Sequence, residues 1–170
     1  MLEDGSVYEG TARGDFKETA CEIVFNTSMT GYVEILTDPS YAGQGVVMTY
    51  PMIGNYGISR EDFESERLQP SAFIVHELSS DPSNFRCTDT IEYLLKEYNI
   101  PCISGVDTRA VVKKLRESGT MRGVLTSDIG DRERLMDVIK SFRQIDLVGS
   151  VTAKQTKVYG EENTGAEIAL

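Results

Sequence analysis

Residues 25–57 read FNTSMTGYVEILTDPSYAGQGVVMTYPMIGNYG and contain more turn-forming residues than an ordinary core segment does. Glycine and proline punctuate the stretch, and apolar residues between them can anchor it. The glycines are Gly31, Gly43, Gly45, Gly54 and Gly57, the prolines are Pro39 and Pro51, and the anchors are Ile35, Leu36, Val46, Val47 and Met48. Because glycine and proline favour bends in the backbone, this pattern predicts a shaped system of surface loops. Loops held on a rigid scaffold are frequent binding sites.

Segments on both sides of this stretch, and one inside it, have the pattern of β-strands. The predicted strands are residues 6–12, 19–26, 46–50, 72–75, 102–106 and 122–127. In the second of them, Cys21, Ile23 and Phe25 occupy alternate positions, which is typical of a sheet with one face more buried than the other. The third ends at Pro51, since proline cannot donate a hydrogen bond to a ladder. Residues 58–69 are polar and mostly acidic, which indicates a solvated loop with at most one helical turn.

Three helices are predicted in the second half of the chain. The first begins at Asp89, which can cap it together with Glu92 three residues later. The second begins at Asp107 or Thr108 and closes at Gly119, and the third begins at Asp131. The apolar faces are Ile91, Leu94, Leu95 and Tyr98 in the first helix, Val111, Val112 and Leu115 in the second, and Leu135, Val138, Ile139 and Phe142 in the third.

Strands dominate the first half of the chain, whereas helices alternate with strands in the second. This order predicts a mixed α/β domain, and it argues against an all-parallel doubly wound sheet. A length of 170 residues suits one domain of ordinary size. We assign residues 1–150 to this domain and residues 151–170, which are polar and unpatterned, to a linker.

Composition argues against several classes of partner and site. The chain has 27 acidic and 17 basic residues, a net charge of -10, so its surface should repel nucleic acid and anionic membranes. Cys21, Cys87 and Cys102 are far apart and form no CxxC pair, which is typical of reduced thiols in a cytosol. His76 is the only histidine, so no metal site is predicted. Without a signal sequence or an apolar span, a soluble cytoplasmic protein is expected.

Residues 25–57 resemble the N-terminal domain of the small, glutamine-using subunit of carbamoyl-phosphate synthase. The similarity lies in the runs FNTSMTGYVEILTDPSYAGQ and MTYPMIGNYG, with fixed spacing between their turn residues. It continues through residues 82–86, 100–101 and 105–109 and ends near Leu125, so it covers about three quarters of the chain. The resemblance implies a three-layer β/β/α domain of the swivelling type.

The resemblance also implies a part in a two-subunit ligase. In that family the small subunit hydrolyses L-glutamine, and ammonia passes through a tunnel to a large subunit that uses ATP and Mg²⁺. The product is carbamoyl phosphate, made with bicarbonate for arginine and pyrimidine biosynthesis. The expected partners of this chain are therefore the large subunit, the C-terminal glutaminase domain of the same subunit, and L-glutamine.

The catalytic centre of the family's glutamine amidotransferase lies in that C-terminal domain, with a cysteine in a glycine-rich elbow and a downstream histidine. This sequence has no such elbow and no histidine after His76. We therefore expect no catalytic residue, no cofactor and no glutaminase activity in this chain alone, and we interpret residues 151–170 as a linker toward an absent amidotransferase domain.

Ser40, in the turn Asp38-Pro39-Ser40-Tyr41, is the one candidate ligand that the resemblance transfers. The matching serine of the family reaches the glutamine site from the N-terminal domain, across the interface between the domains. A hydroxyl on a tight turn can donate to a carboxylate, and neighbouring backbone N–H groups can assist it. The alternative is that Ser40 only closes the turn.

Two further polar groups have both a binding and a structural interpretation. The first group could line an interface with the glutaminase domain or the large subunit, or it could stabilise turns through side-chain bonds to the backbone. It consists of Asn26, Thr27, Ser28, Thr30, Gly31 and Tyr32. In residues 107–109, Asp107 can cap a helix while Arg109 pairs with a neighbouring carboxylate, and we favour this structural role.

Other residues of chemical interest are expected to be structural. His76 ends the apolar run FIVHEL, where family members often carry an arginine, and we expect it to be a satisfied structural residue. The three cysteines lie in no nucleophile elbow and are expected to be small buried apolar side chains. Gly45 and Val47 stand where a larger aliphatic residue and a threonine are common, which predicts a looser strand before Tyr50.

A function of a different class remains as an alternative: a stand-alone interaction module that has lost its catalytic domain. The end of the sequence at Leu170 favours this alternative, whereas the linker-like residues before it favour the synthase subunit. Binding to a large synthetase subunit would support the subunit, and binding to an unrelated partner would support the module.

Overall fold

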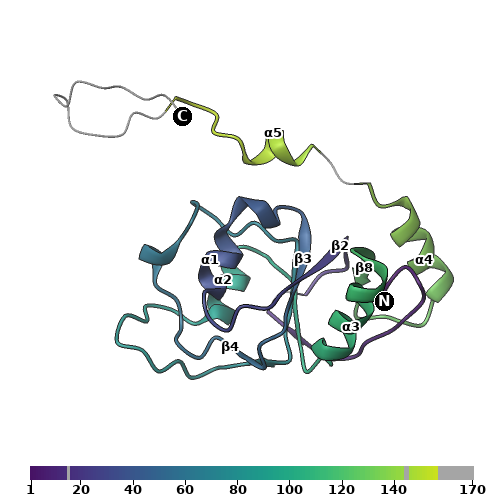
Figure 1. The fold of residues 1–170 in the computed structure, drawn as a ribbon, viewed down its shortest axis with the longest axis horizontal. Helices are drawn as coiled ribbons and strands as arrows, with labels where there is room; N and C mark the ends of the chain where they lie inside the picture. The colour runs from purple at the N-terminus through teal and green to yellow at the C-terminus, as the bar shows by residue number, and fades with distance from the viewer. Residues whose placement is uncertain (15, 144–145, 157–170) are drawn as a thin grey trace.

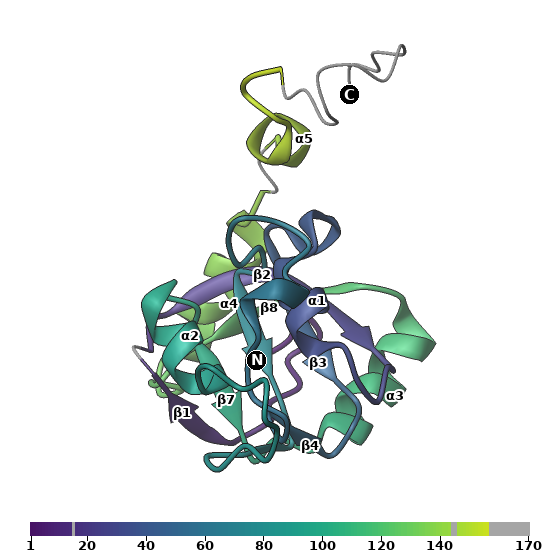
Figure 2. The same cartoon turned by 90° about the vertical axis from the view of Figure 1, so that its left-hand side faces the viewer.

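The computed structural model describes residues 1–14, 16–143 and 146–156. Its main element is a curled six-stranded sheet with the strand order β1-β7-β5-β3-β2-β8 (Figures 1 and 2). The strands are β1 (Thr11–Arg13), β2 (Thr19–Asn26), β3 (Gln44–Met48), β5 (Ala72–Ile74), β7 (Cys102–Ser104) and β8 (Met121–Leu125). The four inner strands are parallel to one another, and the edge strands β1 and β8 are antiparallel to their neighbours. The sheet is therefore mixed, as predicted.

Helices cover both faces of this sheet. The helices are α1 (Tyr32–Thr37), α2 (Ile91–Glu97), α3 (Thr108–Ser118), α4 (Arg132–Ser141) and α5 (Leu147–Val151), with 3₁₀ turns η1 (Pro39–Tyr41) and η2 (Arg60–Asp62). Figure 1 shows α1 and α2 on one side of the sheet and α3 on the other. A two-stranded parallel sheet of β4 (Met52–Ile53) and β6 (Glu77–Leu78) packs on the side of α1 and α2. The prediction of a mixed α/β domain with three layers is confirmed.

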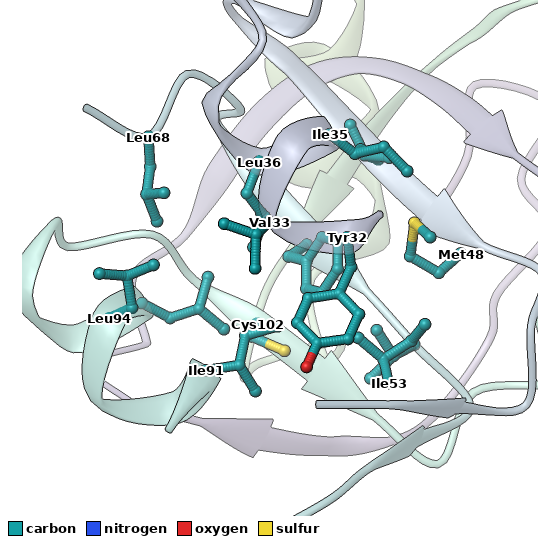
Figure 3. Packing of buried hydrophobic residues seen from close by; sticks show 14 of the residues in the cluster. Tyr32, Val33, Ile35, Leu36, Met48, Ile53, Leu68, Ile91, Leu94 and Cys102 are labelled. Atoms are coloured by element: carbon teal, nitrogen blue, oxygen red, sulfur yellow. The ribbon is translucent and has the colours of Figure 1, made fainter. Parts of the chain in front are cut away.

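Alternation along the strands divides the interior into two cores. In β3, Val46 and Met48 face the core that contains α1 and α2, whereas Val47 faces the core that contains α3. Figure 3 shows the first core, in which the Tyr32 ring lies among Met48, Ile53 and other apolar side chains. Because successive side chains of a strand point to opposite faces, one short strand contributes to both cores.

The prediction of a surface loop system within residues 25–57 is wrong for residues 32–37. Residues 32–37 form α1, and Tyr32, Val33 and Leu36 are almost completely buried in the first core. The sequence YVEILT is too short and too rich in β-branched residues to indicate a helix by itself. Packing against β3, β5 and α2 stabilises a helix that local propensity does not predict.

The strand predictions are confirmed where residues pair within the sheet. Residues 19–26 form β2 with the predicted bounds. Of residues 6–12, however, only Thr11 and Ala12 lie in a strand, β1, which pairs with β7 and not with β2. The chain crosses β7 closely at Gly10, where an added Cβ would lie 2.5 Å from the Ser104 carbonyl oxygen. Residues 6–10 therefore join no ladder in the described part of the chain.

From the sequence we expected Gly45 to loosen its strand, whereas the structure shows that a larger residue would not fit there. A Cβ added there would lie 2.7 Å from the Cys21 Sγ and 2.8 Å from the Ile23 Cδ1 on β2. The small residue thus allows β2 and β3 to pair with their larger side chains in contact. Val47, which stands where a threonine is common in the family, is fully buried.

The helix boundaries confirm two predicted caps and correct a third. Asp107 accepts a hydrogen bond from the N–H of Ala110, and Asp131 accepts one from the N–H of Arg134, so both cap their helices. The cap of α2 is Thr90, which accepts from the Tyr93 N–H, and not Asp89. The backbone of Asp89 is already paired with Ile58, so the helix begins one residue later than we predicted.

The third predicted helix, α4, packs with a narrower face than expected. Leu135 and Ile139 are fully buried against Val124 of β8, whereas Val138 and Phe142 are only partly covered. The helix packs against the edge strand β8, so only Leu135 and Ile139 are fully buried. α5 was not predicted, and residues 157–170 of the expected linker lie outside the described residues. None of the helices in the described ranges has the length and apolar character needed to cross a membrane.

Candidate functional site

The Ser40 turn is the short 3₁₀ segment η1, and its first residue is Pro39, whose ring restricts the backbone φ angle. The Asp38 side chain caps this segment, and its Oδ1 accepts a hydrogen bond of 2.8 Å from the Ser40 N–H. Ser40 itself is exposed, and its hydroxyl forms no hydrogen bond with the part of the chain that the structure describes. The backbone of Ser40 is therefore held in place while its hydroxyl stays free to bind a ligand.

One hydrogen bond joins the Ser40 turn to the polar cluster at the end of β2. Asn26 donates from Nδ2 to the Tyr41 hydroxyl at 2.8 Å, and the Asn26 Oδ1 accepts from the Ser28 N–H at 2.7 Å. The structure thus brings together the start of the predicted cluster and the predicted ligand turn. Thr27, Ser28 and Thr30 are exposed beside this bond, so turn stabilisation by Asn26 leaves them accessible.

The other end of the cluster is buried and structural. Tyr32 is 1% exposed, its ring stacks on that of Tyr56 with centroids 4.1 Å apart, and its hydroxyl donates to the Gly57 carbonyl oxygen at 2.7 Å. The Tyr56 hydroxyl accepts from the N–H groups of Gly31 and Tyr32 at 2.6 and 3.1 Å. Burial raises the pKa of both phenols, so neither is an acid or base near neutral pH.

His76 and Arg109 differ in how well they match their predicted roles. His76 is exposed, and its Nδ1 lies 3.1 Å from the Val106 carbonyl oxygen, which matches a structural residue. Asp107 caps α3 as predicted. Arg109, in contrast, is exposed and forms no ion pair within the described residues, so its expected carboxylate partner is not found.

The cysteines do not have the surroundings of nucleophiles. Cys21 and Cys102 are fully buried, and burial raises the pKa of each thiol to about 12. A reactive thiolate needs the opposite shift. Cys87 is partly buried and its thiol donates to the Asp89 carbonyl oxygen at 3.3 Å. Within the described ranges, no three side chains of His, Cys, Asp or Glu gather as metal ligands would.

A cavity of about 400 Å³ lies at the second core and is lined mostly by apolar side chains, among them Leu2, Tyr8 and Val106. None of its lining residues belongs to the Ser40 turn. The cavity and the candidate ligand are therefore separate features of the fold.

Sequence reasoning singled out Ser40 but missed the residues that position it. Asp38 fixes its backbone, and Tyr41 ties the turn to Asn26. An aspartate before Pro-Ser is a recognisable cap signal, so the role of Asp38 could have been predicted. The bond between Asn26 and Tyr41 joins residues 15 positions apart and has no local signal.

Comparison with known proteins identifies the family. Residues 1–125 match the family model described as carbamoyl-phosphate synthase small chain, CPSase domain. A carbamoyl phosphate synthase small chain of Archaeoglobus fulgidus is 48% identical over 99% of this chain and 48% of the relative. One of Clostridium perfringens is 46% identical over 100% of this chain and 48% of the relative.

A third relative of the same name, from Fusobacterium nucleatum, is 54% identical over 91% of this chain and 43% of the relative. The chain thus spans about half the length of the curated relatives it matches. The family match includes the Ser40 turn and both cores described above. This chain belongs to the family of carbamoyl-phosphate synthase small chains, and its residues 1–125 are the CPSase domain.

Proposed function

We propose that this chain works as the N-terminal part of the small subunit of a glutamine-hydrolysing carbamoyl-phosphate synthase. It contributes Ser40 to the L-glutamine site and docks on a large subunit that uses ATP and Mg²⁺. The complete enzyme makes carbamoyl phosphate from glutamine, bicarbonate and ATP for arginine and pyrimidine biosynthesis. The chain by itself does not hydrolyse glutamine, because the cysteine and histidine of that reaction belong to the C-terminal half of the subunit.

The observation that carries this proposal is the geometry of the Ser40 turn in a chain of this family. The Asp38 cap holds the Ser40 backbone, and the serine hydroxyl projects without an intramolecular partner among the described residues. Such a hydroxyl can donate to the carboxylate of a bound glutamine without breaking another bond.

Replacing Ser40 in the full-length enzyme, assembled with its large subunit, tests the proposal. Ser40→Ala removes one hydrogen bond to a charged group, worth about 1.5 to 3 kcal/mol, or on the order of tenfold to a hundredfold in affinity. We expect the KM for glutamine to rise by that factor. Synthesis driven by added ammonia bypasses the glutamine site and should stay nearly unchanged.

The matched control is Ser118→Ala, which removes an exposed hydroxyl at the end of α3. It should leave both glutamine-driven and ammonia-driven synthesis unchanged. An unaltered glutamine KM in Ser40→Ala would sink the assignment of Ser40. An enzyme that makes no carbamoyl phosphate from either nitrogen source, even with Ser40 intact, would overturn the proposed function itself.

A further inference from the structure

The hydrogen bond between Asn26 and Tyr41 attaches the Ser40 turn to the end of a strand. Asn26 is the last residue of β2, and the sheet holds its backbone, because its carbonyl oxygen accepts from the Thr49 N–H at 3.0 Å. Its side chain is held as well, since the Oδ1 accepts from the Ser28 N–H at 2.7 Å. The Nδ2 that donates to the Tyr41 hydroxyl at 2.8 Å is therefore a fixed donor.

Backbone hydrogen bonds hold the two ends of the turn. The Asp38 N–H donates to the Glu34 carbonyl oxygen of α1 at 2.8 Å, and after the turn the Gly43 N–H donates to the Gln69 carbonyl oxygen at 3.3 Å. A segment held at two points can still rotate about the line that joins them, and glycine at a φ of 74° changes conformation readily. The bond of the Tyr41 hydroxyl is a third attachment, through a side chain, and it opposes this rotation.

The rotation of the turn decides where the Ser40 hydroxyl points. Because a 3₁₀ segment has three residues per turn, neighbouring side chains leave η1 about 120° apart. Tyr41 is half-buried and packs against the first core, whereas Ser40 is exposed. A Tyr41 side chain that is held inward therefore keeps the Ser40 hydroxyl turned outward.

Packing alone does not need the hydroxyl of Tyr41. A phenylalanine would fill the same place beside the first core, and the backbone bonds at the ends of the turn do not involve the phenol. The hydroxyl thus contributes orientation more than buried area. A group that binds a substrate has to be held to within about 0.5 Å of its working position, because small misplacements weaken binding and catalysis strongly.

We propose that Tyr41, held by Asn26, is a positioning residue of the glutamine site: it sets the direction in which Ser40 presents its hydroxyl to the substrate. This inference rests on the proposed function, since it requires Ser40 to bind glutamine. Tyr41 and Asn26 act through Ser40 and do not touch the substrate themselves. Their effect on glutamine binding therefore depends on the presence of the serine hydroxyl.

The test measures the KM for glutamine in the full-length small subunit, assembled with its large subunit. Tyr41→Phe removes only the hydroxyl and should raise this KM about threefold to tenfold, the range expected for one neutral hydrogen bond. Asn26→Ala breaks the same bond from the other side and should raise the KM by a similar factor. Synthesis driven by added ammonia should stay nearly unchanged in both variants.

Combination with Ser40→Ala separates positioning from a general structural role. In an enzyme that already carries Ser40→Ala, Tyr41→Phe should cause no further rise in the KM, because no hydroxyl remains to be oriented. Tyr98→Phe is the matched control. Tyr98 also packs, half-buried, against the first core, but its hydroxyl donates to the Glu66 carbonyl oxygen at 3.4 Å. This control should leave the glutamine KM unchanged and should alter the melting temperature as little as Tyr41→Phe does.

The outcomes distinguish the positioning role from the proposed function. A KM of Tyr41→Phe within about twofold of the unchanged enzyme, beside a large rise in Ser40→Ala, would refute the positioning role and leave the proposed function intact. Equal losses of glutamine-driven and ammonia-driven synthesis in Tyr41→Phe, or a further rise of the KM in the double variant, would also refute it. An unchanged KM in Ser40→Ala would remove the ligand role of Ser40 and the positioning role together.

Discussion

At the scale of single residues, Tyr56 shows how a side chain can start a helix that lies elsewhere in the sequence. Gly31 precedes α1 and offers no side-chain cap. Instead, the Tyr56 hydroxyl accepts hydrogen bonds from the N–H groups of Gly31 and Tyr32. Tyr56 lies 25 and 24 residues further along the chain than these donors. The first backbone donors of a helix have no partner within the helix, so an acceptor at this place has the effect of a cap.

Removing that acceptor should therefore weaken the fold. We expect Tyr56→Phe to lower the free energy of unfolding by about 1 to 2 kcal/mol, the usual cost of losing a cap or leaving a buried donor unsatisfied. Urea unfolding followed by circular dichroism measures it. Tyr93→Phe, at a half-exposed position of α2, is the control and should have no effect. Equal midpoints for Tyr56→Phe and the unchanged protein would mean that the α1 donors find another acceptor.

At the scale of elements, one ion pair joins α4 to Glu18, the residue before β2. Arg134 forms two parallel bonds to Glu18, at 2.7 and 2.8 Å, and the Thr126 hydroxyl donates to the same carboxylate at 2.8 Å. The hydrogen bonds from Arg134, and to a smaller extent the one from Thr126, lower the pKa of Glu18 to about 2. Both side chains are more than one third exposed, so solvent screens most of the interaction.

The lowered pKa sets the sign of a pH dependence. Glu18 has an ordinary pKa of 4.5, so its contribution to stability is fully present above that pH and is lost as the pH falls toward 2. We expect Glu18→Gln to lower stability by about 0.5 to 1 kcal/mol at pH 7 and to have almost no effect at pH 2. Thermal unfolding at a series of pH values measures this difference. Glu117→Gln on α3 is the control, and a loss that stayed constant from pH 7 to pH 2 would contradict the assignment.

At the scale of the whole molecule, the sheet separates two cores and encloses one thiol in each. Cys102 belongs to the core beneath α1 and α2, and Cys21 to the core beneath α3. Burial raises the pKa of both to about 12, and neither is accessible to solvent. Reaction of either thiol thus requires opening of the fold.

Thiol labelling consequently reports on this opening. With an aromatic disulfide reagent at pH 8, we expect Cys87 to react first and Cys21 and Cys102 to react at least a hundredfold more slowly. Labelling in urea should make all three equally fast. The variant Cys87→Ala should lack the fast phase. Two fast thiols in the native protein would show that one core opens locally, without global unfolding.

Much of the fold could be predicted because its signals are local. The alternation in residues 19–26 predicted β2, and the cap at Asp107 with the stop at Gly119 predicted α3. Asp89 and Thr90 are both good caps, and only the pairing of Asp89 with Ile58 decides between them. The glutamine role of Ser40, the domain boundary at residue 150 and the cytosolic location stay predictions.

Local signals in the sequence were enough to establish the family, the mixed α/β class and most elements, because spacing, caps and alternation act over a few residues. The tertiary structure alone decided that residues 32–37 are a buried helix and that Tyr56 caps it. It also decided that Phe85 stays in solvent. Each of these depends on neighbours from distant parts of the chain, and burial is a property of the packed molecule that no local pattern contains.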